Sequence, residues 1–143
     1  MLYSLLKNLH SWLAYVVLIV LVLAIINAIV GFLNKKNFSA KDLRLSLFAL
    51  IFSHIQLLIG FALYFLSPKG IDAFGEMKIS DLRLTWLEHP LMNIIAIALI
   101  TIGWTKHKKM TDDKNKFKKI ALFYGLGLLF ILSRIPFASW LSF

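Results

Sequence analysis

The sequence predicts an all-α integral membrane protein, an up-down bundle of four transmembrane helices in one domain over residues 1–143. The chain is 59% hydrophobic with a mean hydropathy of +0.78, and its apolar residues fall in four long blocks. A soluble domain of this length does not carry so many apolar residues in uninterrupted runs. Residues 8–34 contain no Asp, Glu, Lys or Arg, and this run exceeds the ~20 residues that a helix needs to cross a bilayer.

The four predicted spans cover residues 8–34, 45–67, 85–105 and 120–141. Each is expected to be helical because a backbone in lipid must satisfy its own hydrogen bonds. Ser80 and Asp81 indicate that the third helix begins well before its apolar part. Pro90 then falls in an early turn of that helix, where it can introduce a kink without ending it. Arg134 and Pro136 interrupt the fourth span.

The basic residues predict the orientation of these spans. The loops at residues 35–44 and 106–119 hold eleven of the sixteen lysines and arginines, four in the first and seven in the second. The positive-inside rule places both loops in the cytoplasm and both termini outside, which for a bacterial inner membrane is the periplasm. The net charge of +9 is therefore attributed to topology and anionic lipid, and not to nucleic acid. His107, inside the second loop, is expected to be a solvated residue.

Little of the sequence points to enzymatic chemistry. There is no cysteine, which excludes disulfides, iron–sulfur ligation and thiol chemistry. A zinc site is disfavoured because the chain has no HExxH motif and few carboxylates near its histidines. Ionisable and strongly coordinating residues within spans are rare and are functional hypotheses by default. The candidates are His10, His54, His89 and Arg134, with Gln56 as a polar companion.

Two imidazoles from facing helices can hold a haem iron in the core of a bundle. His10 and His89 lie near the outer ends of the first and third spans, which run in the same direction, so they are the predicted axial ligands of haem b. At about 1.5 Å per residue, His89 lies about 25 Å and His10 about 37 Å above the first cytoplasmic lysine of its helix. The pair therefore requires the first helix to tilt or to project into the cytoplasm.

Two further residues are candidates for the same site. His54, near mid-membrane, is the rival ligand for a pair with His89, but it lies about 200° around its helix from Gln56. Ser53, Gly60 and Tyr64 share the Gln56 side, so His54 points away from the bundle centre if that side faces it. Arg134 suits a haem propionate; alternatively, its side chain snorkels to headgroups.

A family resemblance is carried by three short motifs. His10-Ser-Trp-Leu-Ala-Tyr resembles the opening of a haem-ligating helix in the haem A synthase family. Gln56-Leu-Leu-Ile-Gly60 is similar to the Gln-x-x-Leu-Gly pattern of that family's following helix, with isoleucine in place of the leucine. Glu88-His89-Pro90 falls where the third helix of the family's repeat carries its histidine.

That family consists of two four-helix halves, each able to hold haem between its first and third helices, and this chain resembles one half along almost its whole length. The acidic residue beside His89 is at the wrong spacing for the family's catalytic Glu-x-x-His. The resemblance therefore implies a b-type haem site and does not imply haem A synthesis. The chain also resembles small bacterial membrane proteins called cytochrome b.

Two functions follow from the sequence. The first is an electron-transfer protein that holds haem b and exchanges electrons with quinone or a respiratory membrane complex, rather than a stand-alone enzyme. The alternative is a non-catalytic accessory or assembly subunit of a larger membrane complex, without haem. In that case His54 and the aromatic residues would serve a protein interface. A small transporter is disfavoured because no broken-helix pattern is present.

Overall fold

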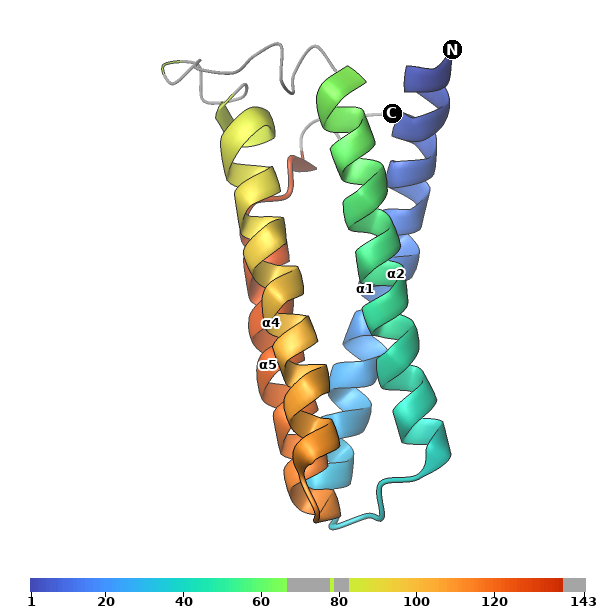
Figure 1. The fold of residues 1–143 in the computed structure, drawn as a ribbon, viewed down its shortest axis with the longest axis vertical. Coiled ribbons are helices and arrows are strands. Elements are labelled where there is room, and N and C mark those ends of the chain that lie inside the picture. Colours follow the sequence, from blue (N-terminus) through green and yellow to red (C-terminus); the bar gives the residue numbers. More distant parts are fainter. Residues whose placement is uncertain (67–77, 79–82, 138–143) are drawn as a thin grey trace.

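A computed structural model describes residues 1–66, 78 and 83–137. These residues form four α-helices, α1 (Leu2–Leu33), α2 (Ala40–Leu66), α4 (His89–Lys109) and α5 (Asp113–Ser133), and a π-helical turn η2 (Leu84–Glu88) that leads into α4. The described ranges contain no strand. The helices run alternately up and down, so the start of α1 and the end of α5 lie at the same end (Figure 1). The predicted all-α, four-helix architecture is confirmed.

The order of the helices around the bundle decides which of them can face each other. α1 packs against α2 and α5, and α4 packs against α5 and α2. α1 and α4 are therefore diagonal neighbours across the bundle axis, and they run in the same direction (Figure 1). Side chains from these two helices meet only in the centre of the bundle.

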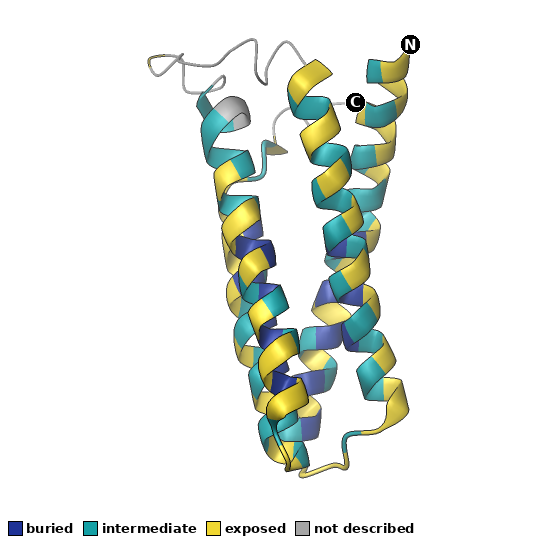
Figure 2. Ribbon diagram, viewed as in Figure 1, coloured by how far each residue is buried: buried dark blue, intermediate teal, exposed yellow. Residues whose placement is uncertain are grey.

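The buried core occupies the half of the bundle that is nearer to the α4–α5 connection (Figure 2). Its largest members are Leu21, Ile100, Phe117, Ile120 and Tyr124, none of them more than 1% exposed. By contrast, no residue of the ranges 1–16 and 54–66 is buried. The half of the bundle near the N-terminus is therefore loosely filled.

Glycine lets the helices approach closely in the core. A Cβ added at Gly127 of α5 would lie 2.8 Å from Ile100 Cγ1 and 3.0 Å from the carbonyl oxygen of Ala96, both in α4.

Across the other diagonal, the hydroxyl of Tyr124 donates a 2.8 Å hydrogen bond to the carbonyl oxygen of Ser46 in α2. A buried tyrosine needs such a partner, and the bond ties α5 to α2.

The helix ends differ from those expected at residues 35–44 and 106–119. α2 begins at Ala40, where Ser39 N–H donates to Asp42 Oδ2 at 2.8 Å in the manner of a capping box. The same carboxylate accepts a 2.8 Å hydrogen bond from Asn27 of α1. The lysine-rich loop at residues 106–119 is mostly helical, because α4 continues to Lys109 and Asp112 caps α5 by accepting from the Asn115 N–H.

The fourth helix also ends earlier than residue 141. α5 stops at Ser133, with Arg134 as its C-cap. Pro136 explains the stop, since proline has no N–H and disfavours helical backbone in the residue before it. Pro90 lies in the first turn of α4, directly after η2, and does not break the helix. The helix start expected at Ser80 and Asp81 lies outside the described residues, as do residues 138–143.

His107 is not the solvated residue that the sequence predicted. It is 1% exposed, and its ring centre lies 4.7 Å from that of Trp104 and 5.3 Å from that of Phe38. Its Nδ1–H donates to the carbonyl oxygen of Trp104. The reason is helical phase: because α4 continues past Lys106, His107 extends the core-facing stripe that includes Gly103.

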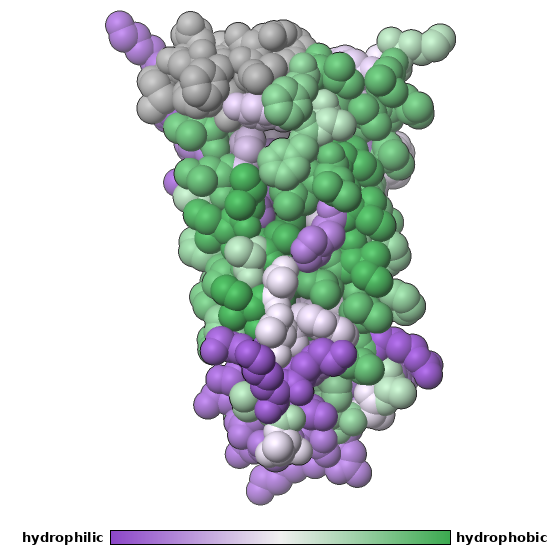
Figure 3. Space-filling model, in the orientation of Figure 1, coloured by the Kyte–Doolittle hydropathy of each residue, from purple (hydrophilic) through white to green (hydrophobic). Residues whose placement is uncertain are grey.

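The outer surface of the bundle is apolar. α1 and α2 are long and apolar enough to cross a membrane. Large apolar side chains are exposed on all four helices, among them Trp12 and Leu58 at 67% and Leu129 at 64%. Figure 3 shows a hydrophobic band above a hydrophilic end, the end at which α4 and α5 are joined. Soluble monomers rarely expose continuous apolar surface of this extent.

Candidate functional site

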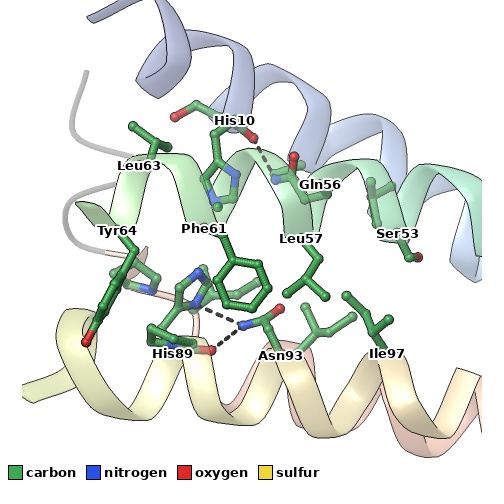
Figure 4. Close-up of a pocket in the computed structure, with 18 of the residues that line it drawn as sticks. His10, Ser53, Gln56, Leu57, Phe61, Leu63, Tyr64, His89, Asn93 and Ile97 are labelled. Atoms are coloured by element: carbon green, nitrogen blue, oxygen red, sulfur yellow. Dashed lines mark hydrogen bonds between the residues drawn. The ribbon is translucent and has the colours of Figure 1, made fainter. Parts of the chain in front are cut away.

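A cavity of about 270 Å³ lies in the loosely filled half of the bundle, toward the end that carries the N-terminus. Side chains from α1, α2, α4 and α5 contribute to it (Figure 4). The lining is mainly apolar, and its polar members are Tyr3, Lys7, His10, Ser11, Ser53, Gln56, Tyr64, His89 and Asn93. Cofactor pockets generally measure about 300–1,000 Å³, so this cavity is slightly smaller than that range.

His10 and His89 face each other across this cavity. Their ring centroids are 6.3 Å apart and the ring planes are almost perpendicular, at 87°. In Figure 4 the His10 ring projects from α1 and the His89 ring from α4, each toward the other. The two residues come from the diagonal helices, so the space between them is the centre of the bundle.

The difference in height estimated from the sequence is not present at the rings. The estimate counted from the first lysine after each span, but α4 continues through Lys106 to Lys109, whereas α1 ends at Leu33. Measured to the actual helix ends, His10 is about 34 Å and His89 about 30 Å along its helix. The remaining offset is within the reach of two side chains that point toward each other.

His89 Nδ1 has two neighbours within hydrogen-bond distance. The backbone carbonyl oxygen of Arg134 lies 3.0 Å away and Asn93 Nδ2 lies 3.2 Å away. Because the carbonyl oxygen can only accept and its contact is the shorter, we place the proton on Nδ1, which leaves the lone pair on Nε2. Asn93, four residues later, donates a 2.6 Å hydrogen bond to the His89 carbonyl oxygen. Such contacts are the kind that orient a metal-ligating histidine.

His10 is positioned mainly by α2. A Cβ added at Gly60 would lie 3.3 Å from His10 Cε1, so the glycine lets the imidazole pack against the α2 backbone. The amide of Gln56 donates a 2.8 Å hydrogen bond to the His10 carbonyl oxygen. Within the described ranges, His10 Nδ1 and Gln56 Oε1 are buried without a hydrogen-bond partner. Buried polar atoms without a hydrogen-bond partner are uncommon in folded proteins. They are found where a side chain has a redox or catalytic role or binds a water or an ion.

The other sequence candidates lie elsewhere. The guanidinium of Arg134 pairs with Glu88 at 3.2 Å and does not line the cavity. Glu88 also pairs with Arg83 at 2.8 Å. The sequence predicts that the side chain of Arg134 lies near the site. In the structure it is the backbone carbonyl oxygen of Arg134 that lies beside His89.

His54 is also outside the cavity lining. Its Nδ1 donates to the carbonyl oxygen of Leu50 in its own helix at 2.8 Å, and its Nε2 is 3.4 Å from Thr101 Oγ1 of α4. Ser53, Gln56 and Gly60, in contrast, all line the cavity. The Gln56 side of α2 thus faces the bundle centre, and His54 contacts the neighbouring helix.

Sequence reasoning missed several polar residues of the cavity, among them Lys7 and Asn93. Helical spacing was the available signal: Lys7 precedes His10 by three residues, and Asn93 follows His89 by four. Positions three and four apart share a helix face. Each histidine therefore brings a polar neighbour from the adjacent turn into the cavity.

The residues present suit some metal groups and not others. The described part of the chain has no cluster of three or more His, Cys, Asp or Glu that could hold a bare metal ion. Two imidazoles bound on opposite sides of one metal have ring centres about 6 Å apart, given metal–nitrogen bonds of about 2 Å and ring bonds of about 1.33 Å. The observed 6.3 Å is consistent with that arrangement.

The chain matches no protein family, curated protein or solved structure with which it was compared.

Proposed function

We propose that this chain is a four-span membrane protein that binds haem b between His10 and His89 and passes electrons. The observation that carries the proposal is the pair itself: two imidazoles from diagonal helices, facing each other at 6.3 Å across a mainly apolar cavity. Haem b would bring most of the nitrogen ligands of its iron, so that the protein would need to supply only His10 and His89. That requirement explains a site with two histidines and no further metal ligands among the described residues.

Membrane insertion of all four helices is part of the proposal. Between their charged ends, η2 and α4 run from Leu84 to Thr105, about 33 Å of helix, which matches a hydrocarbon core of about 30 Å. The apolar part of α5, from Ile120 to Ser133, gives about 21 Å. The exposed leucines and isoleucines of α4 and α5 continue the apolar surface of α1 and α2. The lysine-rich ends at residues 35–44 and 106–119 favour the cytoplasmic side of a bacterial inner membrane. Both termini, and the histidine pair, are then on the periplasmic side.

The bound haem would supply one-electron redox chemistry, and the chain's own residues would hold, orient and shield it. His89 would present Nε2, because the carbonyl oxygen of Arg134, 3.0 Å from Nδ1, favours a proton on Nδ1. His10 packs on Gly60, and the surrounding apolar side chains exclude water. No nucleophile–base pair is required, so we assign electron exchange with quinone or a respiratory complex, and not a stand-alone enzymatic reaction. The resemblance to one half of a haem A synthase is part of the same proposal, because it implies a b-type haem site.

The cavity volume sets one condition on this proposal. At about 270 Å³ the cavity is small for a macrocycle, so side chains at its wall must move outward when haem enters. Phe61 meets this condition, because it lines the cavity and is 39% exposed on the outside of the bundle. Its ring can turn toward lipid without opening the buried core.

Absorption spectra of the purified full-length protein, oxidised and then reduced with dithionite, test the proposal. The protein should be produced in haem-replete cells and extracted in a mild detergent. We expect a b-type spectrum whose sharp bands appear on reduction, with about one haem per chain. A folded but colourless protein, by circular dichroism and gel filtration, would contradict the proposal and favour the accessory-subunit alternative.

A further inference from the structure

One basic residue lines the cavity. Among the described residues of its lining, Lys7 is the only lysine or arginine, and none carries a carboxylate. Arg134, the cation that the sequence offered for this purpose, is paired with Glu88 and does not line the cavity. In the part of the chain that the structure describes, the charge nearest to a bound ligand is therefore that of Lys7.

The position of Lys7 relative to the histidine pair is fixed by α1. Lys7 lies three residues before His10 on the same side of the helix, about 4.5 Å farther along the axis toward the N-terminal end. Two tyrosines, Tyr3 from α1 and Tyr64 from α2, line the same cavity. The polar groups at this end of the cavity are thus one ammonium and two phenols.

The remainder of the cavity is mainly apolar, with Ser11, Ser53, Gln56 and Asn93 as its polar members besides the two histidines. On the other side of the histidine pair the wall is formed by Val17, Leu18, Ile97 and Ile131. A ligand that fills this space would have an apolar body and an anionic end, with the anionic end toward the N-terminus. Carboxylate groups suit a single lysine because an ammonium acts as a compact point charge with three donors.

We propose that Lys7 is the carboxylate-binding residue of this site and fixes the orientation of the ligand, with its acidic edge toward the N-terminal end of the bundle. This inference rests on the proposed function, since haem b carries two propionates on one edge of an apolar macrocycle. The ammonium of Lys7 pairs with one propionate, and Tyr3 and Tyr64 supply hydroxyl donors beside it. Lys7 thus selects the diacid porphyrin and one of the two ways in which the ring can enter.

Haem dimethyl ester tests this inference, because it keeps the iron and macrocycle but lacks the negative charges. Full-length protein produced without haem would be titrated with haem and with its dimethyl ester, and the dissociation constants compared for wild type, Lys7→Gln and Lys7→Arg. Wild type should prefer haem by about fivefold, the effect of one partly exposed ion pair. Lys7→Gln should reduce that preference to near unity, and Lys7→Arg should retain it.

A matched control is Lys36→Gln, which removes the same charge at the opposite end of the bundle and should leave the preference unchanged. Equal affinity of wild type for the two porphyrins, or an undiminished preference in Lys7→Gln, overturns the role of Lys7. If the wild type binds neither porphyrin, it is the proposed function that fails. Because Lys7 is exposed at the helix surface, its substitution does not disturb the core, and the outcomes remain interpretable.

Discussion

The Nδ1 atom of His89 lies 3.0 Å from the backbone carbonyl oxygen of Arg134. This contact joins the first turn of α4 to the residue that caps α5. It favours the proton of His89 on Nδ1, since a carbonyl oxygen can only accept, and a proton there leaves Nε2 available as a ligand. The part of Arg134 that bears on the site is thus its backbone, while its side chain pairs with Glu88.

Arg134→Gln should therefore leave the ligand set intact. The variant keeps the backbone carbonyl and removes only a pair whose side chains are 44% and 26% exposed. Exposed pairs contribute at most about 1 kcal/mol, so the loss of stability should be below that. The check is the reduced spectrum together with thermal unfolding in detergent. Loss of the haem spectrum in this variant would mean that the guanidinium itself supports the site.

Gly60→Leu should disrupt the site with little effect on the rest of the fold. A Cβ at this position already approaches His10 Cε1 to 3.3 Å, and a leucine side chain would displace the imidazole from the cavity wall. We expect at least a tenfold reduction in haem content, measured from the absorbance ratio of haem to protein. Gly125→Leu is the control, because nothing lies within 4 Å of a Cβ at Gly125; equal haem loss in both variants would contradict the assignment.

Gly127 and Gly125 offer a matched test of the α4–α5 interface. Gly127→Ala places a methyl group 3.0 Å from the Ala96 carbonyl oxygen, so the helices must separate; overpacking of this kind typically costs about 1–3 kcal/mol. Gly125→Ala, two residues away in the same helix, should be neutral or stabilising by up to about 1 kcal/mol, because alanine is the better helix former. Chemical unfolding in detergent measures both. Equal effects at the two positions would mean that α4 and α5 are not in close contact at Gly127.

His107 predicts a dependence of stability on pH. Burial lowers the pKa of His107 below its ordinary value; the hydrogen bond to Trp104 opposes this effect, and the charges of Lys116 and Lys108 add to it. Below a pH of about 6.5 the His107 side chain becomes protonated in the unfolded chain but stays neutral in the folded chain. The free energy of unfolding therefore falls as the pH is lowered. This loss is absent above that range.

The measurement is the melting temperature between pH 8 and pH 5 for wild type and for His107→Phe, which preserves the aromatic packing against Phe38 and Trp104. The part of the acid destabilisation that comes from His107 should disappear in the variant. Parallel curves of melting temperature against pH for the two proteins would show that the pKa of His107 is not lowered in the folded protein.

Hydrophobic blocks and helical geometry were enough to predict the four helices, and to predict that the helices of His10 and His89 run in the same direction with these residues near the same end. The helix ends were less predictable. Runs of lysine were interpreted as loops, yet α4 and α5 continue through them, because the aliphatic part of lysine is compatible with helix and the charge lies in water. The same misjudged ends produced the apparent height difference between the two histidines and the wrong environment for His107.

The partners of the site residues were beyond sequence reasoning for a different reason. The contact of His89 with Arg134 uses a backbone carbonyl, and any residue type supplies one, so no sequence pattern records it. The direction of the Arg134 side chain depends on its pairing with Glu88, 46 residues earlier in the chain. Helical spacing did contain the signal for Lys7, but that signal becomes meaningful only once the cavity is known to face that side of α1.

The most direct test of the account is the axial ligation of haem in wild type, His10→Ala, His89→Ala and His54→Ala, measured by low-temperature electron paramagnetic resonance of the oxidised proteins. The account predicts a low-spin signal with two imidazole ligands in wild type and in His54→Ala. It predicts the loss of that signal, with high-spin haem or none, in both His10→Ala and His89→Ala. An unchanged low-spin signal in either of these two variants would contradict the histidine pair as the haem site.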